Sequence, residues 1–310
     1  MIMTKNLINL SYKTIQIICW SMLAVTSYAN SVACFTSNMG QFCIELFESH
    51  TPITTANFLN YIHNGSYTNG VFHRSIPGFV IQGGGFKVVD GAAGKSLATV
   101  ATLPPINNEF KISNTRGTVA MAKIDRQPNS ATSQWFVNLV DNSGDPNNLD
   151  TQNSGFTVFG RVIFDGMSVF DAIAQLPRTS SHFPYLATSE PQIPITNLVQ
   201  VSEIAVQKPT GVFHEGIASF AVDIGDGSNI LEVKLRLVNS DPELLFELDS
   251  GSMQILSSRP ENVATYLPQS GEVSIPAVML GPTTMINNIR MQLVNTEPFQ
   301  FVLKSYESGN

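Results

Sequence analysis

The sequence predicts a mainly β protein, with a closed β-barrel capped by two helices in its first two thirds and a small all-β sandwich after it. Three observations support this fold class. Up to residue 207, short β-like runs alternate with long loops rich in Gly, Asn and Pro. Only two segments carry the apolar spacing and the end signals of a helix. After Gly211, the chain changes to strict alternation of apolar and polar residues.

The two predicted helices have recognisable ends. The first begins at Thr51-Pro52, with Thr51 as the expected N-cap, and stops before Gly65. The second covers residues 167–176 and ends at Pro177. The runs that predict strands in this region are residues 70–73, 78–82, 117–122, 134–139, 156–164 and 195–206.

Residues 208–211, Lys-Pro-Thr-Gly, have the composition of a linker, so we expect one domain over residues 30–207 and another over 212–310. In the second, Leu231, Val233 and Leu235 alternate with Glu232 and Lys234. Segment 237–242 is echoed by segment 293–298, each between two alternating runs. The repeat predicts a duplicated hairpin within one sandwich.

Composition limits the classes of function. The chain has 310 residues, a formal charge of −7 and only 13% charged residues. Because it lacks a basic surface for phosphates, we expect no nucleic-acid partner. An apolar fraction of 43% excludes a disordered chain, and no segment is long and apolar enough to span a membrane.

The first 29 residues predict a secretory signal peptide. Two lysines, Lys5 and Lys13, precede an apolar stretch over residues 15–25, and Ser27 and Ala29 supply the small residues of a cleavage site. Cleavage after Ala33, which would leave Cys34 first as in a lipoprotein, is the alternative. We therefore expect export to the periplasm or secretion.

The two cysteines that follow the signal lie in one predicted hairpin. If the turn is centred on Asn38-Met39, counting outward places Cys34 opposite Cys43. A disulfide suits an oxidising compartment, and two buried free thiols are the alternative.

Several common catalytic motifs are missing from the sequence. It contains no Cys-x-x-Cys, His-Glu-x-x-His, Gly-x-Ser-x-Gly or P-loop pattern, so we expect neither a metal nor a cofactor. The glycines at 83–85 indicate close backbone packing. Segments 141–145 and 223–228 imitate parts of calcium loops but lack the final Glu, which favours solvated turns.

One segment identifies a family. Residues 71–84 read Val-Phe-His-Arg-Ser-Ile-Pro-Gly-Phe-Val-Ile-Gln-Gly-Gly, which strongly resembles the signature of the cyclophilin peptidyl-prolyl cis-trans isomerases. Matching patterns follow in order at residues 117–122, 133–136 and 156–161. The resemblance covers about residues 32–206 and implies an eight-stranded closed antiparallel barrel with two capping helices. It also implies an enzyme that isomerises Xaa-Pro bonds of exported proteins and assists their folding.

The same resemblance assigns the candidate site. Arg74 matches the donor that stabilises the twisted amide, with Gln82 and His73 as its catalytic neighbours. The residues expected to bind the proline-containing substrate are Phe79, Val80, Gln134, Phe136, Leu149 and Phe156, with backbone groups of Ala122 and Lys123. The reaction makes and breaks no covalent bond, which agrees with the missing catalytic motifs.

Departures from the family pattern affect the expected partners. Asn148 stands where animal cyclophilins have a cyclosporin-binding Trp, and Phe156 where they often have His, so we expect weak cyclosporin binding by a monomer. The alternative function is a non-catalytic envelope protein that grips proline segments as a scaffold. A third possibility, sugar binding through residues 212–310, has only the predicted sandwich behind it.

Overall fold

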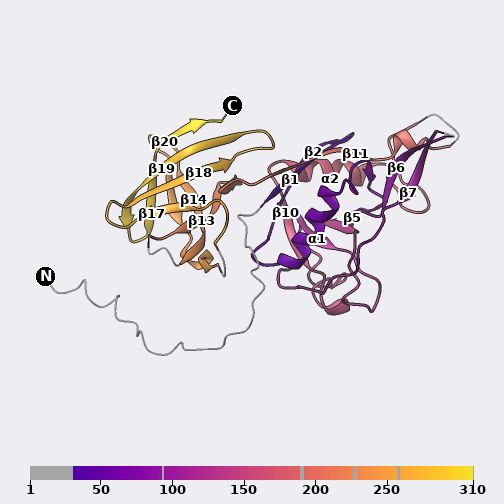
Figure 1. The fold of residues 1–310 in the computed structure, drawn as a ribbon, viewed down its shortest axis with the longest axis horizontal. Coiled ribbons are helices and arrows are strands. Elements are labelled where there is room, and N and C mark those ends of the chain that lie inside the picture. Colours follow the sequence, from indigo (N-terminus) through magenta and orange to yellow (C-terminus); the bar gives the residue numbers. More distant parts are fainter. Residues whose placement is uncertain (1–30, 93, 189–191, 226–228, 257–258, 310) are drawn as a thin grey trace.

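The computed structural model describes residues 31–309, except residues 93, 189–191, 226–228 and 257–258. The predicted signal peptide therefore lies outside the described residues. Figure 1 shows two β-rich halves side by side, the N-terminal half in indigo to magenta and the C-terminal half in orange to yellow. No helix in the described part of the chain has the length and apolarity to cross a membrane.

The N-terminal half is built on one curled antiparallel sheet of eight strands. Their order is β11-β1-β2-β10-β8-β9-β5-β4. The strands are β1 (Val32–Ser37), β2 (Gly40–Leu46), β4 (Arg74–Ile76), β5 (Val80–Gly83), β8 (Thr118–Met121), β9 (Trp135–Asn138), β10 (Val158–Ile163) and β11 (Val201–Gln207). A smaller sheet contains β3 (Gly70–Val71), β6 (Phe86–Gly91) and β7 (Gly94–Thr99).

The predicted full closure of this barrel is wrong. Among the described residues, the edge strands β4 and β11 form no ladder with each other, so the sheet is a curled half-barrel. The gap is bridged only locally, by the pair Val71 and Gln200 and by the Phe72 N–H, which donates to the Val199 carbonyl at 3.1 Å. With only three residues in β4, a longer ladder has no room to form.

Helices α1 (Pro52–His63) and α2 (Gly166–Gln175) lie within one residue of the predicted segments. Thr51 does not cap α1 with its side chain, because its hydroxyl donates to the Phe47 carbonyl. The Glu109 carboxylate accepts the N–H groups of Ile53 and Thr54 instead. The described 3-10 helices are η1 (Gln152–Ser154), η2 (Ile195–Asn197) and η3 (Ser250–Ser252).

The core of the N-terminal half is unusually aromatic. The Phe35 and Phe42 rings, which are cross-strand partners, stack with centroids 4.9 Å apart. The Trp135 ring meets the Phe58 ring edge-on at 5.8 Å. These contacts fix β1, β2, α1 and β9 against one another, and β9 is a strand on which the candidate site depends.

The C-terminal half is a closed barrel, so the predicted sandwich is wrong. Seven strands form an unbroken ring in the order β13-β17-β18-β19-β20-β15-β14, and β14 pairs again with β13. The strands of this half are β12 (Gly211–His214), β13 (Ile217–Asp223), β14 (Ile230–Asn239), β15 (Leu245–Leu248), β16 (Gln254–Ile255), β17 (Ala264–Leu267), β18 (Glu272–Met279), β19 (Met285–Thr296) and β20 (Phe299–Ser308).

The alternation of apolar and polar residues cannot distinguish a closed barrel from a sandwich, because both architectures bury one face of every strand. Register shifts between β19 and β20 and between β14 and β15 bend the long strands and allow the ring to close. The two copies of the repeated segment lie in the hairpins β14–β15 and β19–β20.

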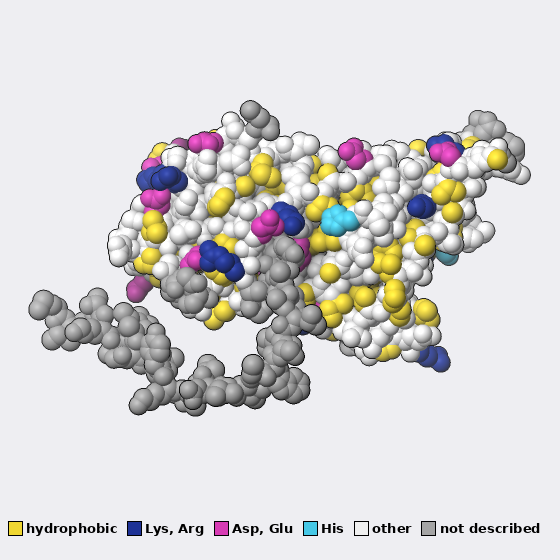
Figure 2. Space-filling model, in the orientation of Figure 1, with side chains coloured by type: hydrophobic (Ala, Val, Ile, Leu, Met, Phe, Trp, Pro, Cys, Tyr) yellow, Lys and Arg dark blue, Asp and Glu magenta, His cyan; other side chains and the backbone are white. Residues whose placement is uncertain are grey.

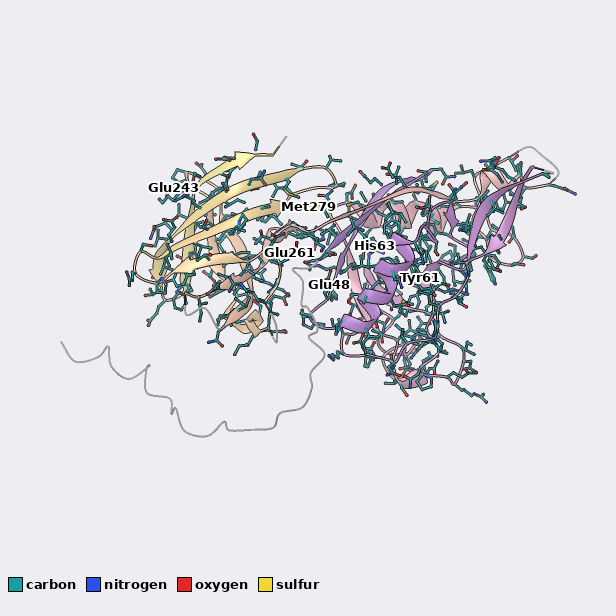
Figure 3. The ribbon with its side chains drawn as sticks, viewed as in Figure 1. Glu48, Tyr61, His63, Glu243, Glu261 and Met279 are labelled. Carbon is teal, nitrogen blue, oxygen red and sulfur yellow. A yellow bond between two sulfur atoms is a disulfide. The ribbon has the colours of Figure 1, made fainter. Side chains whose placement is uncertain are left out.

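The halves meet through a small apolar cluster. Val32, Cys34 and Ile163 of the N-terminal half pack with Val212 and Met279 of the C-terminal half. In Figure 3, Met279 lies on the side of the barrel that faces the N-terminal half. The junction also includes polar contacts, such as the Phe164 N–H, which donates to His214 Nδ1 at 3.0 Å.

Candidate active site

A tight hairpin between β4 and β5 positions the predicted donor. Arg74 is the first residue of β4 and lies opposite Gln82 of β5. The turn contains Pro77 and Gly78, whose φ of +71° suits the third position of a type II turn, and the Phe79 N–H closes it on the Ile76 carbonyl at 3.0 Å. No other atom crowds Gly78, so the conformation alone requires the glycine.

A row of polar side chains extends from the arginine into the protein. Arg74 Nη1 donates to Gln82 Oε1 at 3.5 Å, and Gln82 Nε2 donates to Gln134 Oε1 at 2.7 Å. His73 Nε2 lies 3.2 Å from the same Gln134 oxygen. The sequence spreads these four residues over 61 positions, and the pairing of β4, β5 and β9 brings them together.

The Arg74 guanidinium keeps free donors. Its carbon atom lies 5.5 Å from the centre of the Phe79 ring, and among the described residues no carboxylate forms an ion pair with it. Partial burial lowers the pKa of Arg74, but an arginine remains charged at neutral pH. The site therefore presents a positive hydrogen-bond donor beside an aromatic ring.

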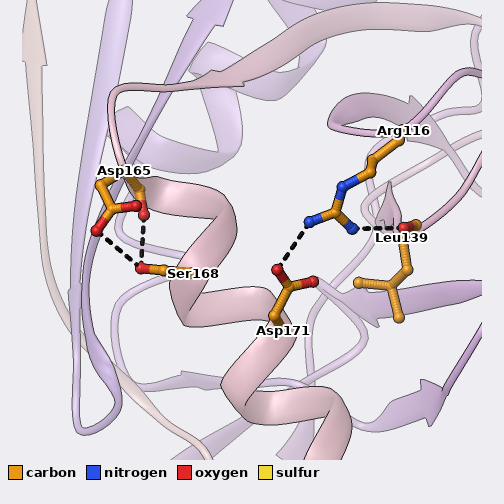
Figure 4. A network of polar contacts seen from close by, with 5 residues as sticks. All are labelled: Arg116, Leu139, Asp165, Ser168 and Asp171. Carbon is orange, nitrogen blue, oxygen red and sulfur yellow. Dashed lines mark hydrogen bonds and ion pairs between the residues drawn. The ribbon is translucent and has the colours of Figure 1, made fainter.

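Arg116 shows the contrasting arrangement (Figure 4). Its guanidinium donates to the Leu139 carbonyl at 2.5 Å and to the Asp171 carboxylate at 2.7 Å, which links the chain near β9 to helix α2. These two bonds hold the Arg116 guanidinium in a structural role. The free donors of Arg74 are thus a property of its position rather than of arginine in general.

Next to Arg74 lies an apolar cluster that contains the five apolar side chains expected to bind the proline-containing substrate. Val80, Phe136 and Leu149 are almost completely buried, whereas Phe79 and Phe156 are partly exposed. The Phe136 and Phe156 rings meet edge-on with centroids 5.8 Å apart. The surface that a ligand can touch is therefore formed mainly by Phe79 and Phe156, with the buried members supporting them.

Ala122 and Lys123 border this cluster. The Ala122 N–H already donates to the Gln134 carbonyl at 2.9 Å. Lys123 Nζ donates to the carbonyls of Asn153 and Gly155 and lies 4.6 Å from the centre of the Phe156 ring. Burial lowers the pKa of Lys123 to about 8. The lysine thus ties the loop that carries Phe156 to the strand end.

A network of buried asparagines, which sequence reasoning missed, supports the cluster from below. Asn142 Nδ2 donates to the Phe79 carbonyl at 3.0 Å and to Asn138 Oδ1 at 2.8 Å. Asn138 Nδ2 donates to Asn114 Oδ1 at 3.2 Å, and Asn114 Nδ2 donates to the Phe156 carbonyl at 3.0 Å. These three fully buried side-chain amides therefore connect the backbone carbonyls of the partly exposed Phe79 and Phe156.

Gly83, which ends β5, and the two glycines that follow it provide close packing, as predicted. A Cβ atom on Gly84 would lie 2.3 Å from the Ser133 carbonyl oxygen. A Cβ atom on Gly85 would lie 2.9 Å from the His73 ring and 3.1 Å from the Gln134 amide. The absence of side chains here leaves room for the polar row beside Arg74.

His73 is buried, and this burial determines its charge. Desolvation lowers the pKa of His73 to about 4, against a smaller opposing effect of its hydrogen bond to Gln134. The imidazole is therefore neutral at physiological pH. A neutral His73 can orient Gln134 but carries no charge to the site.

The remaining predicted positions lie elsewhere. Cys34 and Cys43 are cross-strand partners on β1 and β2 and form a disulfide in the contact between the halves. In segment 141–145, Asp141 accepts the N–H and the hydroxyl of Ser143, as in a simple turn. Asp223 differs from the expected solvated turn, because it is buried and pairs with Arg259 at 2.6 Å.

Comparison with known proteins identifies the family of the N-terminal half. The model of the family described as cyclophilin type peptidyl-prolyl cis-trans isomerase matches residues 32–200. The chain therefore belongs to the cyclophilin family and is a peptidyl-prolyl cis-trans isomerase. The match ends before β12, so the C-terminal barrel lies beyond it.

Three curated relatives carry the same name. A peptidyl-prolyl cis-trans isomerase of Acinetobacter baylyi is 40% identical over 51% of this chain and 80% of its own length. Peptidyl-prolyl cis-trans isomerase B of Escherichia coli is 43% identical over 45% of this chain and 81% of its own. Peptidyl-prolyl cis-trans isomerase A of Dickeya dadantii is 35% identical over 53% of this chain and 85% of its own length.

Proposed function

We propose that this isomerase acts on Xaa-Pro bonds of exported polypeptides and assists their folding, with Arg74 as the principal catalytic residue. The observation that carries the assignment is the charged guanidinium with free donors beside the Phe79 ring. Phe156 lies in the same apolar cluster as Phe79 and offers a partly exposed ring to the substrate. A proline ring packs on these aromatic residues while its amide faces the arginine.

The chemistry follows from amide resonance. Rotation about an Xaa-Pro bond meets a barrier of about 18–20 kcal/mol because the planar amide loses its resonance. In the twisted state the proline nitrogen is pyramidal and accepts a hydrogen bond. An Arg74 N–H that donates to this nitrogen stabilises the twisted state more than the planar one and so raises the rate.

The other polar residues hold this donor and the substrate. Gln82 accepts a hydrogen bond from Arg74, and Gln134 links Gln82 to the neutral His73, so the row limits the rotamers of the guanidinium. Because the Ala122 N–H already donates to the Gln134 carbonyl, Ala122 binds the extended peptide through its own carbonyl group. The backbone of Lys123 binds the same peptide.

An isomerisation assay of the full chain tests this activity. A peptide with a single Xaa-Pro bond is equilibrated toward the cis isomer, and its return to the trans isomer is followed with and without the protein. We expect an acceleration that is proportional to protein concentration. A rate equal to the uncatalysed rate would contradict the activity and would favour a non-catalytic proline-binding scaffold.

We further propose that the chain has an isomerase domain over residues 30–207, a linker over 208–211 and an appended domain over 212–310. We also propose that the chain is exported, to the periplasm or outside the cell. The disulfide between Cys34 and Cys43 supports this location, since disulfides persist in oxidising compartments. Mass spectrometry of the chain purified from cell fractions tests it. A mature chain that begins at Asn30 and has no free thiol is the expected result, and an intact, reduced cytoplasmic chain would contradict it.

The proposed partners follow from the surface and the site. The face in Figure 2 is mostly uncharged, with a few acidic and basic side chains that lie next to one another, and the net charge is −7, so the partners are neutral polypeptide segments rather than nucleic acid. We expect a monomer. We also expect weak cyclosporin binding, because Asn148 offers little apolar surface.

A further inference from the structure

The C-terminal barrel contains a hollow that the isomerase site does not use. A cavity of about 380 Å³ is lined by residues of strands β13, β14, β15, β17, β18 and β20. It is the right size for a small organic ligand, since ligand cavities have volumes of roughly 300–1,000 Å³. The interiors of small β-barrels are normally filled by side chains, and those that stay hollow hold ligands.

The lining of this cavity is apolar. None of the described residues that line it is charged, and the Tyr266 hydroxyl is their only polar side-chain group apart from the Met253 sulfur. The backbone groups of the surrounding strands are paired within the ring. An occupant therefore finds almost no hydrogen-bond partner, and its buried part must be uncharged and without donors or acceptors.

These properties exclude a peptide as the occupant. A polypeptide segment inside the cavity would bury backbone N–H and C=O groups without partners, at a cost of several kcal/mol for each group. A folded protein would cover only the opening and leave the interior empty. A hydrocarbon chain, by contrast, loses no hydrogen bond when it leaves water and gains from its burial.

The shape of the cavity suits an extended chain. The lining residues Leu231, Val233 and Leu235 follow one another along the inner face of β14, and the four residue steps from the first to the last cover about 13 Å. At the opening, Met253 and Phe299 are 43% and 45% exposed. They form an apolar entrance that leads from solvent to the buried Val273.

We propose that the C-terminal barrel binds one long alkyl chain in this cavity, with the polar head group of the ligand left in solvent beside Met253 and Phe299. The ligand class is a single-chain amphiphile or the acyl chain of a lipid. The site is independent of Arg74, because its lining residues belong to β13–β20 and their connecting segments.

Displacement of a fluorescent apolar probe tests this site. The full chain is titrated with 1-N-phenylnaphthylamine and then with dodecanoate, and we expect dodecanoate to displace the probe bound in this cavity. Val273→Trp places an indole inside the cavity and is expected to weaken dodecanoate binding at least tenfold. Thr265→Trp adds the same side chain to an exposed position on β17 and is expected to bind as the wild type does.

A second variant and a second source of acyl chains complete the test. Phe299→Ser changes only the partly exposed entrance and is expected to weaken binding severalfold even if Val273→Trp does not fold. Flotation with didodecanoyl phosphatidylcholine vesicles distinguishes a membrane lipid from a free amphiphile as the ligand. The proposal is overturned if neither source binds, or if the folded Val273→Trp or Phe299→Ser variant binds as tightly as the wild type.

Discussion

Two arginines of the N-terminal half show how position decides the role of a residue. Arg116 uses its donors on Leu139 and Asp171, whereas Arg74 keeps donors free beside Phe79. The sequence predicts the role of Arg74 because the surrounding motif is specific. It does not predict the support of the site by Asn114, because a fully buried Asn and an exposed one look alike in a sequence.

The neutral His73 predicts a pH dependence of stability. His73 takes up a proton near pH 6.5 in the unfolded chain but only near pH 4 in the folded one. Between these values the unfolded state binds more protons, so stability falls as the pH falls from 6.5 to 4. The loss should be about 3 kcal/mol from this residue. Urea unfolding at a series of pH values measures it.

The control for this prediction is His73→Gln, which keeps a hydrogen-bonding side chain and does not titrate. Its free energy of unfolding should fall less than that of the wild type between pH 6.5 and pH 4. Other titrating groups, such as Glu48, whose pKa is raised by burial, contribute equally to both proteins and cancel in the difference. Parallel curves for the two proteins would contradict the neutral, buried imidazole.

At the scale of elements, local signals predict both helices of the N-terminal half but miss β4, β6 and β7, and they do not predict how the sheets close. The ends of α1 follow from Pro52 and Gly65, whereas Gly78, the expected start of a strand, lies in the turn that aims Arg74. Alternation also identified the inner faces of the C-terminal strands. It could not show that β14 returns to β13, because the pairing of strands distant in sequence depends on bulges and twist that no short pattern records.

The asparagine network predicts that Asn142→Ala impairs both stability and substrate binding. The substitution leaves Asn138 Oδ1 without its Asn142 donor in a buried place, and the Phe79 carbonyl keeps only the hydrogen bond from the Leu139 N–H. The free energy of unfolding should fall by about 1–3 kcal/mol. The KM should rise because Phe79 loses one of the two hydrogen bonds that hold its carbonyl. The matched control is Asn107→Ala at an exposed position, and equal behaviour of the two variants would refute the network.

At the scale of the whole molecule, the isomerase site and the barrel cavity lie in different halves, which meet at the cluster around the Cys34–Cys43 disulfide. The sequence predicts two units from the change in pattern after Gly211. It does not predict their contact, because Val32 and Met279 look like ordinary strand residues in isolation.

Met279→Ala tests this contact. The side chain is fully buried between the halves, so its truncation should lower the free energy of unfolding by about 2–5 kcal/mol. The kcat/KM for isomerisation should stay unchanged, because the cluster contains no residue of the Arg74 site. Leu267→Ala, at a position 48% exposed, is the control and should change neither quantity. A loss of activity in folded Met279→Ala would show that the halves are coupled.

The most direct test of the catalytic assignment is the ratio of kcat/KM between the wild type and Arg74→Ala in the Xaa-Pro isomerisation assay. Removal of a preorganised donor to the twisted amide should lower kcat/KM by about a hundredfold to a thousandfold. Arg116→Ala, which removes an arginine held by Leu139 and Asp171, should retain activity within a few-fold of the wild type. Equal kcat/KM values for Arg74→Ala and the wild type would contradict the role assigned to Arg74.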